Sequence, residues 1–184
     1  HNSDPRYVKN TKAIRSLSFD EAAELAYFGA KILHPSSIQP AKKANIPVRM
    51  KNTMNPSDEG TLITKESPIK DFKAVAAKDG ITAIKVESWK TPIDMIATSE
   101  VAISLTIDST CHLEDIKKDL TKYGTIEVEE SLSIICIVGD CSINNSGLAA
   151  RALTALEDIP LHMISYGASE HSISLLVKQA DKQK

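Results

Sequence analysis

The sequence predicts an α+β fold that contains two similar modules. A duplication carries this prediction: the stretch from Pro92 to Ile107 returns as the stretch from Pro160 to Val177. Pro, Met-Ile, Ser-Glu and Ile-Ser-Leu coincide once the second copy is allowed an insertion. Each copy has a strand, a short polar turn and a second alternating strand, a pattern typical of a β-hairpin. Repeated units in one chain usually fold as similar modules packed together.

The composition indicates a globular chain with a core of its own. Of 184 residues, 42% are hydrophobic and 25% are charged, and the net charge is only −2. No run of like charge is long enough to form a nucleic-acid surface. The longest apolar stretches, such as 132–138, have the length of a strand and are too short to span a bilayer. We therefore expect no nucleic-acid partner and no membrane partner.

The three cysteines indicate a reducing compartment. Cys111, Cys136 and Cys141 do not have the spacing of a metal site, and their number is odd. Together with the absence of a visible signal peptide, this favours reduced thiols and a cytoplasmic location. Cys136 lies inside an apolar run and is expected to be an ordinary core residue.

Local signals define the elements of the first third. Residues 1–16 are polar and are expected to be irregular. Ser18 and Glu21 form a capping-box pattern that predicts a helix from Phe19 to about Phe28, ended by Gly29. A second helix is expected over 36–44, followed by extended segments at 46–50 and 60–64 with a turn-rich loop between them.

The remaining chain is rich in strands. Strands are predicted over 72–77 and 81–86, with Lys78-Asp79-Gly80 as a turn between them. An extended stretch over 125–138 is expected to break near residues 129–130. Helices are expected over 113–123, over 146–158 and at the start of a final segment at 180–184. The second of these helices has Ser146 as its expected cap and an apolar face of Leu148, Ala149, Ala152, Leu153 and Leu156.

The second copy has the element order of a ferredoxin-like βαββαβ unit, with antiparallel strands and helices on one face of the sheet. The first copy should match it, but only residues 87–92 separate the strand ending at Val86 from the hairpin. A crossover between parallel strands needs about a dozen residues. We therefore expect that a helical segment is missing near 88–91. Unbroken Cα spacings of about 3.8 Å there would contradict this.

Several motifs resemble one family. Thr98-Ser99-Glu100-Val101 and the segment 164–169 resemble the tandem ACT domains of aspartate kinases. Asp4-Pro5-Arg6 and the Gly-Ala-Lys-x-Leu-His-Pro pattern over 29–35 are similar to motifs near the end of that family's catalytic domain, as is the stretch 55–63. The resemblance covers essentially the whole chain in the correct order.

The resemblance implies a division into three parts. Residues 1–66 would be a helical C-terminal fragment of an amino-acid-kinase catalytic domain. Residues 80–125 would form the first ACT module. Residues 67–79 and 126–184 would form the second module, and the modules would join two chains into a homodimer.

The implied activity of the parent enzyme is transfer of a phosphoryl group from ATP, with Mg²⁺, to the side chain of aspartate. In this resemblance Arg6, Lys31 and Ile32 lie along the nucleotide site, where cations can neutralise phosphate charge. His1 stands where the family has a tyrosine. The family's Lys-Phe-Gly-Gly-Thr motif and its aspartate-binding residues are absent. We therefore expect no catalytic residue here, an inactive fragment, and no cofactor requirement of its own.

The resemblance also implies feedback control by an amino acid. The matching effector residues are Asp94, Thr98, Ser99, Glu100 and Val101. A carboxylate suits an ammonium group, and hydroxyls with turn amides suit a carboxylate. Lysine is the expected effector and threonine the less favoured one. No metal site is expected.

Two alternatives stay open at this stage. One is a free-standing amino-acid-binding regulator built from ACT modules, and the other is a parent enzyme fused to a homoserine dehydrogenase. Among isolated polar residues, His34 is expected to be a packed helix-end residue rather than a catalytic base. His162 and His171 have no partner at metal-ligand spacing, and Asp140 and Asn144-Asn145 are expected to cap a loop.

Overall fold

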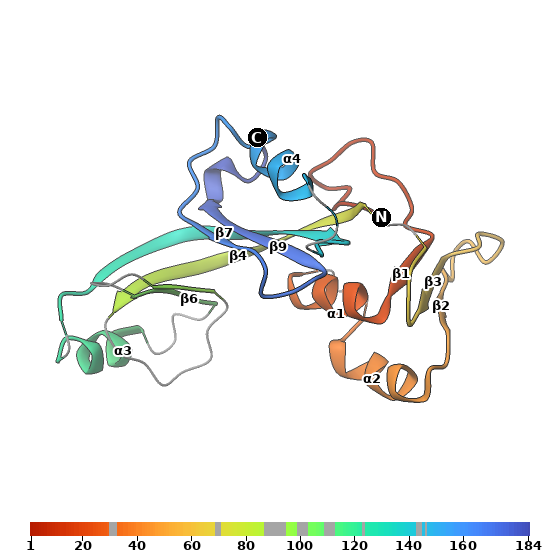
Figure 1. Cartoon of the computed structure of the whole chain (residues 1–184), viewed down its shortest axis with the longest axis horizontal. Helices are drawn as coiled ribbons and strands as arrows, with labels where there is room; N and C mark the ends of the chain where they lie inside the picture. Colours follow the sequence, from red (N-terminus) through yellow and green to blue (C-terminus); the bar gives the residue numbers. More distant parts are fainter. Residues whose placement is uncertain are drawn as a thin grey trace. The chain divides into compact units, whose positions relative to one another are not determined.

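The structure, a computed structural model, describes residues 1–29, 33–68, 71–86, 95–98, 103–108, 113–122, 124–142, 145 and 147–184 (Figure 1). It is an α+β fold, as predicted, and its described strands form two sheets. Three strands form one sheet in the order β1-β3-β2, and six form the other in the order β5-β6-β4-β7-β9-β8. The strands are β1 (Ser16–Ser18), β2 (Val48–Met50), β3 (Thr61–Thr64), β4 (Phe72–Val86), β5 (Ile96–Thr98), β6 (Ile103–Ile107), β7 (Glu127–Gly139), β8 (Met163–Ser165) and β9 (Ser172–Lys178).

Contacts along the chain define two compact units. The first contains residues 1–77, 135–157 and 166–174, and the second contains 78–134, 158–165 and 175–184. The described helices are α1 (Phe19–Tyr27), α2 (Pro35–Ala44), α3 (Leu113–Leu120), α4 (Leu148–Thr154) and a 3-10 turn, η1 (Gln179–Asp181). None of these helices has the length and apolar character needed to cross a membrane.

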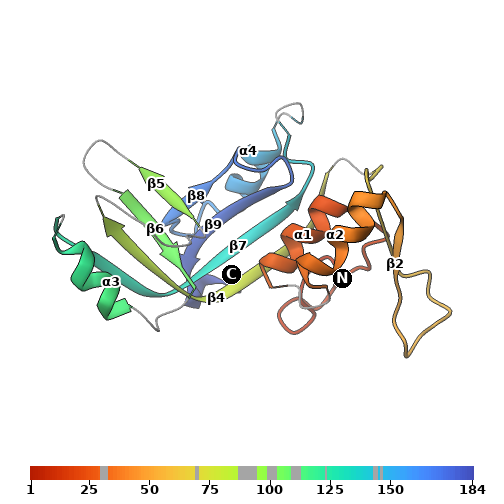
Figure 2. The same ribbon diagram turned by 90° about the horizontal axis from the view of Figure 1, so that it is seen from below.

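Helix α1 begins as the capping-box pattern predicts. The Ser18 hydroxyl accepts a hydrogen bond from the Glu21 amide at 3.1 Å, and the Glu21 carboxylate accepts one from the Ser18 amide at 2.7 Å. These two bonds satisfy N–H groups that a helix start leaves without partners. Phe19, Ala22 and Leu25 form the buried face of the helix. Helix α2 lies beside α1 (Figure 2).

The first strand of the three-stranded sheet begins at Ser16, at the end of the stretch 1–16 that was expected to be irregular. Strand β1 pairs with β3 in parallel, Leu17 opposite Ile63, and β2 pairs with β3 in antiparallel fashion. Just before β1, the Arg15 carbonyl accepts a hydrogen bond from the Leu62 amide at 2.9 Å. This pairing joins residues far apart in the sequence, so local composition does not reveal it.

Strand β4 does not turn at Lys78-Asp79-Gly80, which corrects the prediction of two strands. It runs unbroken from Phe72 to Val86, with Gly80 at a φ of 74°. The Asp79 carboxylate accepts hydrogen bonds from the Ser133 hydroxyl at 2.7 Å and from Lys182 Nζ at 2.5 Å. Partial burial opposes the charged form of Asp79, but these two bonds outweigh it and lower its pKa. The tripeptide therefore lies within a continuous strand, with a left-handed backbone at Gly80 and a carboxylate bonded by distant side chains.

Two further expectations are wrong in detail. Strand β7 is continuous over the expected break at 129–130, and its irregularity is a positive φ of 60° at Ser131. Helix α4 spans only Leu148–Thr154, and its N-cap is Gly147, which makes no side-chain capping bond. The expected cap, Ser146, lies outside the described residues. Leu148 and Ala152 are buried as expected, whereas Leu153 is 38% exposed.

The repeated hairpins are present. Strands β5 and β6 pair in antiparallel fashion, with Ala97 opposite Ser104, and β8 is the neighbour of β9. Strand β6 pairs in turn with β4, from Thr82 opposite Ile107 to Val86 opposite Ile103. Helix α3 contributes Leu113 and Leu120 to the core that this sheet forms with Ile84, Leu105 and Ile107.

Gly139 ends β7 at a point of close backbone approach. A Cβ there would lie 2.4 Å from the carbonyl oxygen of Asp71 and 2.8 Å from the Cα of Phe72. We expect Gly139→Ala to lower the free energy of unfolding by about 3 kcal/mol, because the new methyl group overlaps backbone atoms. Urea unfolding followed by circular dichroism measures this change.

Gly167→Ala is the control for that experiment. Gly167 has a φ of 86°, but a Cβ there would meet no atom within 4 Å. Its substitution should cost only the left-handed backbone penalty of about 1 kcal/mol. A smaller loss for Gly139→Ala than for Gly167→Ala would contradict the close approach.

Cys136 and Cys141 are core residues, which confirms the expectation for Cys136. Both are free and buried. Burial raises the pKa of the Cys136 thiol to about 12, with a hydrogen bond involving Ser174 acting in the opposite direction. Burial also raises the pKa of the Cys141 thiol to about 11. Cys111 lies outside the described residues.

We expect both buried thiols to react slowly in the folded chain. The thiolate is the reactive form, so at pH 8 these pKa values reduce alkylation by roughly 100-fold or more relative to an ordinary cysteine. A timed iodoacetamide pulse followed by peptide mass spectrometry measures the rate at each residue. Urea-unfolded chain is the control, and equal rates in folded and unfolded chain would refute the assignment.

Candidate functional site

The Asp4-Pro5-Arg6 segment forms a tight exposed turn. The Asp4 carboxylate accepts bonds from the Arg6 amide at 2.9 Å and from Arg6 Nη2 at 2.6 Å. The side-chain hydrogen bond to Asp4 and the negative charge of Asp4 raise the pKa of the Arg6 guanidinium above its usual value. The Arg6 side chain is 79% exposed, and its guanidinium lies 5.7 Å from the ring centre of Tyr7. A fully charged, preoriented arginine at the surface can bind an anion.

The loop that carries Arg6 is attached to the start of β4. The Asn2 carbonyl accepts a hydrogen bond from the Val75 amide at 2.9 Å. The Asn2 side chain accepts another from the Lys12 amide at 2.8 Å, which closes the loop. The position of Arg6 therefore depends on β4.

The other predicted nucleotide residues follow α1. Gly29 ends this helix with a φ of 115°, and a Cβ there would lie 2.8 Å from the carbonyl oxygen of Ala77 in β4. Glycine is required at this position for both reasons. Lys31 and Ile32 lie outside the described residues.

His34 is a capping residue rather than a base. Its Nδ1 accepts a hydrogen bond from the Ser36 amide at 3.3 Å, at the start of α2. The expectation of a helix-end residue is confirmed, although His34 is exposed rather than packed.

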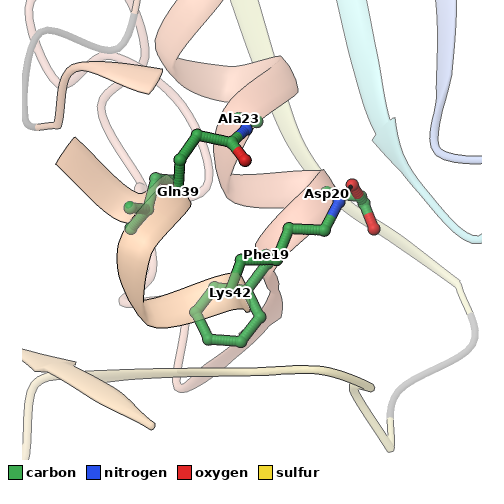
Figure 3. A pocket seen from close by; sticks show the side chains of 6 residues that line it. Phe19, Asp20, Ala23, Gln39 and Lys42 are labelled. Carbon is green, nitrogen blue, oxygen red and sulfur yellow. Dashed lines mark hydrogen bonds and ion pairs between the residues drawn. The ribbon is translucent and has the colours of Figure 1, made fainter. Parts of the chain in front are cut away.

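A small hollow lies between α1 and α2 (Figure 3). Phe19 is one of its lining residues, and Lys42 and Asp20, which also line it, form an ion pair. Its volume of about 10 Å³ has room for about one water molecule. The hollow is therefore too small to hold a nucleotide or an amino acid. Its lining residues are Phe19, Asp20, Ala23, Ile38, Gln39 and Lys42.

The first hairpin carries the predicted effector residues. Thr98 ends β5 opposite Ile103 of β6. Just before β5, the Met95 amide donates to the Thr106 hydroxyl at 2.9 Å, and the Thr106 amide donates to the Met95 carbonyl at 3.0 Å. These bonds fix the base of the hairpin. Asp94, Ser99, Glu100 and Val101 lie outside the described residues.

Helix α1 has two acidic side chains with bonding partners that the sequence did not predict. The Ser169 hydroxyl, in the loop between β8 and β9, donates to the Glu24 carboxylate of α1 at 2.9 Å. One helical turn earlier, Glu21 accepts a hydrogen bond from Lys73 Nζ at 2.7 Å. The sequence predicted Glu21 only as a capping residue of α1. Lys73, in a predicted strand, gave no sign of its partner.

The remaining polar candidates have structural roles. The Asp140 carboxylate accepts from the Ser142 amide at 3.3 Å, and the Asp140 carbonyl accepts from the Asn145 side chain at 2.9 Å, which supports the expected loop role. His162 Nδ1 lies 3.0 Å from a Glu129 carboxylate oxygen. Within the described part of the chain, no three His, Cys, Asp or Glu side chains gather as a metal site would require.

Sequence profiles of two families match separate parts of the chain. The amino acid kinase family matches residues 1–52, and the ACT domain matches residues 135–184. Chloroplastic aspartokinase 1 from Arabidopsis thaliana is 32% identical over 98% of this chain and 37% of that relative. Lysine-sensitive aspartokinase 3 from Escherichia coli is 30% identical over 100% of this chain and 47% of that relative. The chain thus spans less than half the length of these curated relatives.

Solved structures give the same result. E. coli aspartokinase III matches over 99% of this chain in two complexes. The R-state with aspartate and ADP gives a TM-score of 0.87 at 31% identity over 47% of that chain, and the T-state with lysine and aspartate gives 0.83 at 32% over 46%.

A smaller structure is covered almost completely. It is assigned as the C-terminal regulatory domain of aspartate kinase from Porphyromonas gingivalis, and it is 43% identical, with a TM-score of 0.53, over 60% of this chain and 88% of its own length. With a kinase match followed by an ACT match along one chain, the chain belongs to the aspartokinase family.

Proposed function

We propose that this chain is the regulatory portion of an aspartate kinase, which transfers a phosphoryl group from ATP to the side chain of aspartate under feedback control by an amino acid. The observation that carries the proposal is the order of the matches, kinase at 1–52 and ACT at 135–184. A free-standing ACT regulator would have no need of the kinase segment.

Arg6, Lys31 and Ile32 are the proposed nucleotide-binding residues. The exposure and charge of Arg6 support its role, since phosphoryl transfer depends on cations positioned near the phosphates. The ADP bound to E. coli aspartokinase III supports ATP as the phosphoryl donor. Mg²⁺ would accompany ATP as a phosphate counter-ion, as in other phosphoryl transfers.

Lysine is the proposed effector, and Asp94, Thr98, Ser99, Glu100 and Val101 are its proposed ligands. The T-state complex of E. coli aspartokinase III contains lysine, which favours lysine over threonine. The well-anchored base of the first hairpin supports a binding role, because a fixed scaffold positions the groups at its tip.

The proposed domains remain 1–66 for the kinase fragment, 80–125 for the first ACT module, and 67–79 with 126–184 for the second. The lengths of the alignments support a missing segment, and its proposed place in the first module rests on the short spacing between Val86 and the first hairpin. The alignments extend over 212 positions for the Arabidopsis relative and 214 for the E. coli relative, although this chain has 184 residues. The proposed position of the gap, 88–91, lies outside the described residues.

A homodimer through the ACT modules is proposed on the basis of exposed apolar side chains in two strands. Strands β5 and β8 are the two edge strands of the six-stranded sheet. Each exposes a large apolar side chain, Ile96 at 55% and Ile164 at 47%. Strands β5 and β8 also contact each other within the chain. The exposed apolar side chains, rather than free strand edges, are therefore the proposed surface for a second chain. The free, buried cysteines are consistent with the proposed cytoplasmic location.

Calorimetric titration with lysine, and then with threonine, tests the effector site in the complete protein. We expect lysine to bind, and Glu100→Ala to weaken binding about tenfold or more because a carboxylate no longer faces the ammonium group. Glu114→Ala is a matched control, since this carboxylate is 85% exposed and pairs with Lys117. If neither lysine nor threonine gives a heat of binding, the effector assignment is wrong.

Steady-state kinetics of the complete enzyme test the nucleotide assignment. We expect Arg6→Ala to lower kcat/KM for ATP by roughly 10- to 100-fold, because a charge-assisted contact with phosphate is lost. Arg15→Ala is the control: Arg15 is also an exposed arginine paired with an aspartate, Asp58. Equal losses in the two variants would argue against a specific role for Arg6.

A further inference from the structure

Helix α1 is held by groups from outside the kinase-matched segment. Glu21 and Glu24 lie one turn apart and therefore on one face of the helix. Glu21 accepts from Lys73 at 2.7 Å, with both side chains nearly inaccessible at 4% and 2% exposure. Glu24 accepts from the Ser169 hydroxyl at 2.9 Å. Lys73 belongs to β4, and Ser169 belongs to the second hairpin.

The Ser169 hydroxyl has one available orientation. It accepts a hydrogen bond from the His171 amide at 3.1 Å, and since an amide only donates, the single hydroxyl proton goes to Glu24. The loop itself is fixed to the end of β7. The Gly139 amide donates to the His171 carbonyl at 3.0 Å, and the Cys141 amide donates to the Glu170 carbonyl at 2.8 Å. The position of the hydroxyl therefore depends on the position of the loop between β8 and β9.

Helix α1 and the glycine after it also meet β4 at two places. Glu21 meets Lys73, and Gly29 meets the carbonyl of Ala77. Helix α1 spans Phe19–Tyr27, and Gly29 follows its end. The ion pair attaches the start of α1 to β4, and the close approach at Gly29 places the chain after the helix beside the same strand. The far end of β4 pairs with β6 of the first hairpin, from Thr82 to Val86.

The contacts of α1 lie inside one compact unit. Residues 1–77, 135–157 and 166–174 pack together, so the kinase-matched segment and much of the ACT-matched segment share that unit. Ser169 is also the counterpart of Ser99 in the duplicated Ser-Glu pair. The first copy of this serine is a proposed effector ligand, and the second is bonded to the kinase-matched helix.

We propose that Lys73 and Ser169 are positioning residues that carry the regulatory state of the two hairpins to helix α1, and so to the kinase segment. This inference rests on the proposed function. Strand β4 would carry the state of the first hairpin through Lys73 and Ala77. The loop after β8 would carry the state of the second hairpin through Ser169. Hydrogen bonds suit this task because they are lost over small displacements.

Hydrogen exchange of the 184-residue chain tests the contact directly. We expect Ser169→Ala and Glu24→Ala each to speed amide exchange in α1 several-fold, and the double variant to exchange no faster than the single ones, since both remove the same bond. Ser169→Thr keeps the hydroxyl and should restore protection. Ser57→Ala is the control, because the Ser57 hydroxyl donates to the Asn55 side chain in its own loop at 2.8 Å, away from α1 in the sequence. Unchanged exchange in α1 for Ser169→Ala would overturn the inference.

Inhibition of the complete enzyme by lysine tests transmission. We expect Ser169→Ala to change the half-inhibiting lysine concentration by roughly fivefold or more while kcat without lysine stays unchanged. Ser169→Thr should retain the original concentration. If the half-inhibiting lysine concentration is unchanged in Ser169→Ala, the proposed transmission is wrong, even if amide exchange in α1 changes. Absence of any aspartate kinase activity would refute the proposed function instead, and hydrogen exchange would still decide the contact.

Discussion

The buried ion pair between Glu21 and Lys73 is the interaction on which the first compact unit depends. Removal of two charges from water costs several kcal/mol, and the pair is tolerated only where both partners are well bonded. Here the Glu21 carboxylate accepts from Lys73 and also from the Ser18 amide. One carboxylate thus both starts α1 and fixes it to β4. Among the described residues, no buried side-chain nitrogen or oxygen lacks a hydrogen-bond partner.

The sequence predicted those elements whose stabilising contacts lie between residues close together in the chain. The beginning of α1 follows from Ser18 and Glu21, whose partners lie three residues apart. The strand through Asp79 could not be predicted, because its carboxylate is satisfied by Ser133 and Lys182 from distant parts of the chain. The Glu21–Lys73 and Glu24–Ser169 contacts were missed for the same reason. Their separations of 52 and 145 residues leave no periodic or spacing signal.

The duplication has different consequences in its two copies. Both copies form hairpins, as repetition predicts, since the alternating pattern decides strand formation. Their polar tips are free to diverge because loop residues contribute little to the core. In the second copy the serine is bonded to Glu24, and its neighbour Glu170 is tied by its carbonyl to Cys141. A serine committed in this way has no proton left for a ligand, so the second tip suits attachment better than binding.

A polar attachment suits the proposed response of α1 to a regulatory state. An apolar contact keeps most of its energy when surfaces slide by an ångström, because burial changes little. A buried ion pair loses far more under the same shift, because each charge would remain buried without its partner. Helix α1 therefore either follows β4 or breaks from it, with no favourable intermediate position. Regulation requires discrete alternatives of this kind, since an effector acts only through its differential affinity for two states.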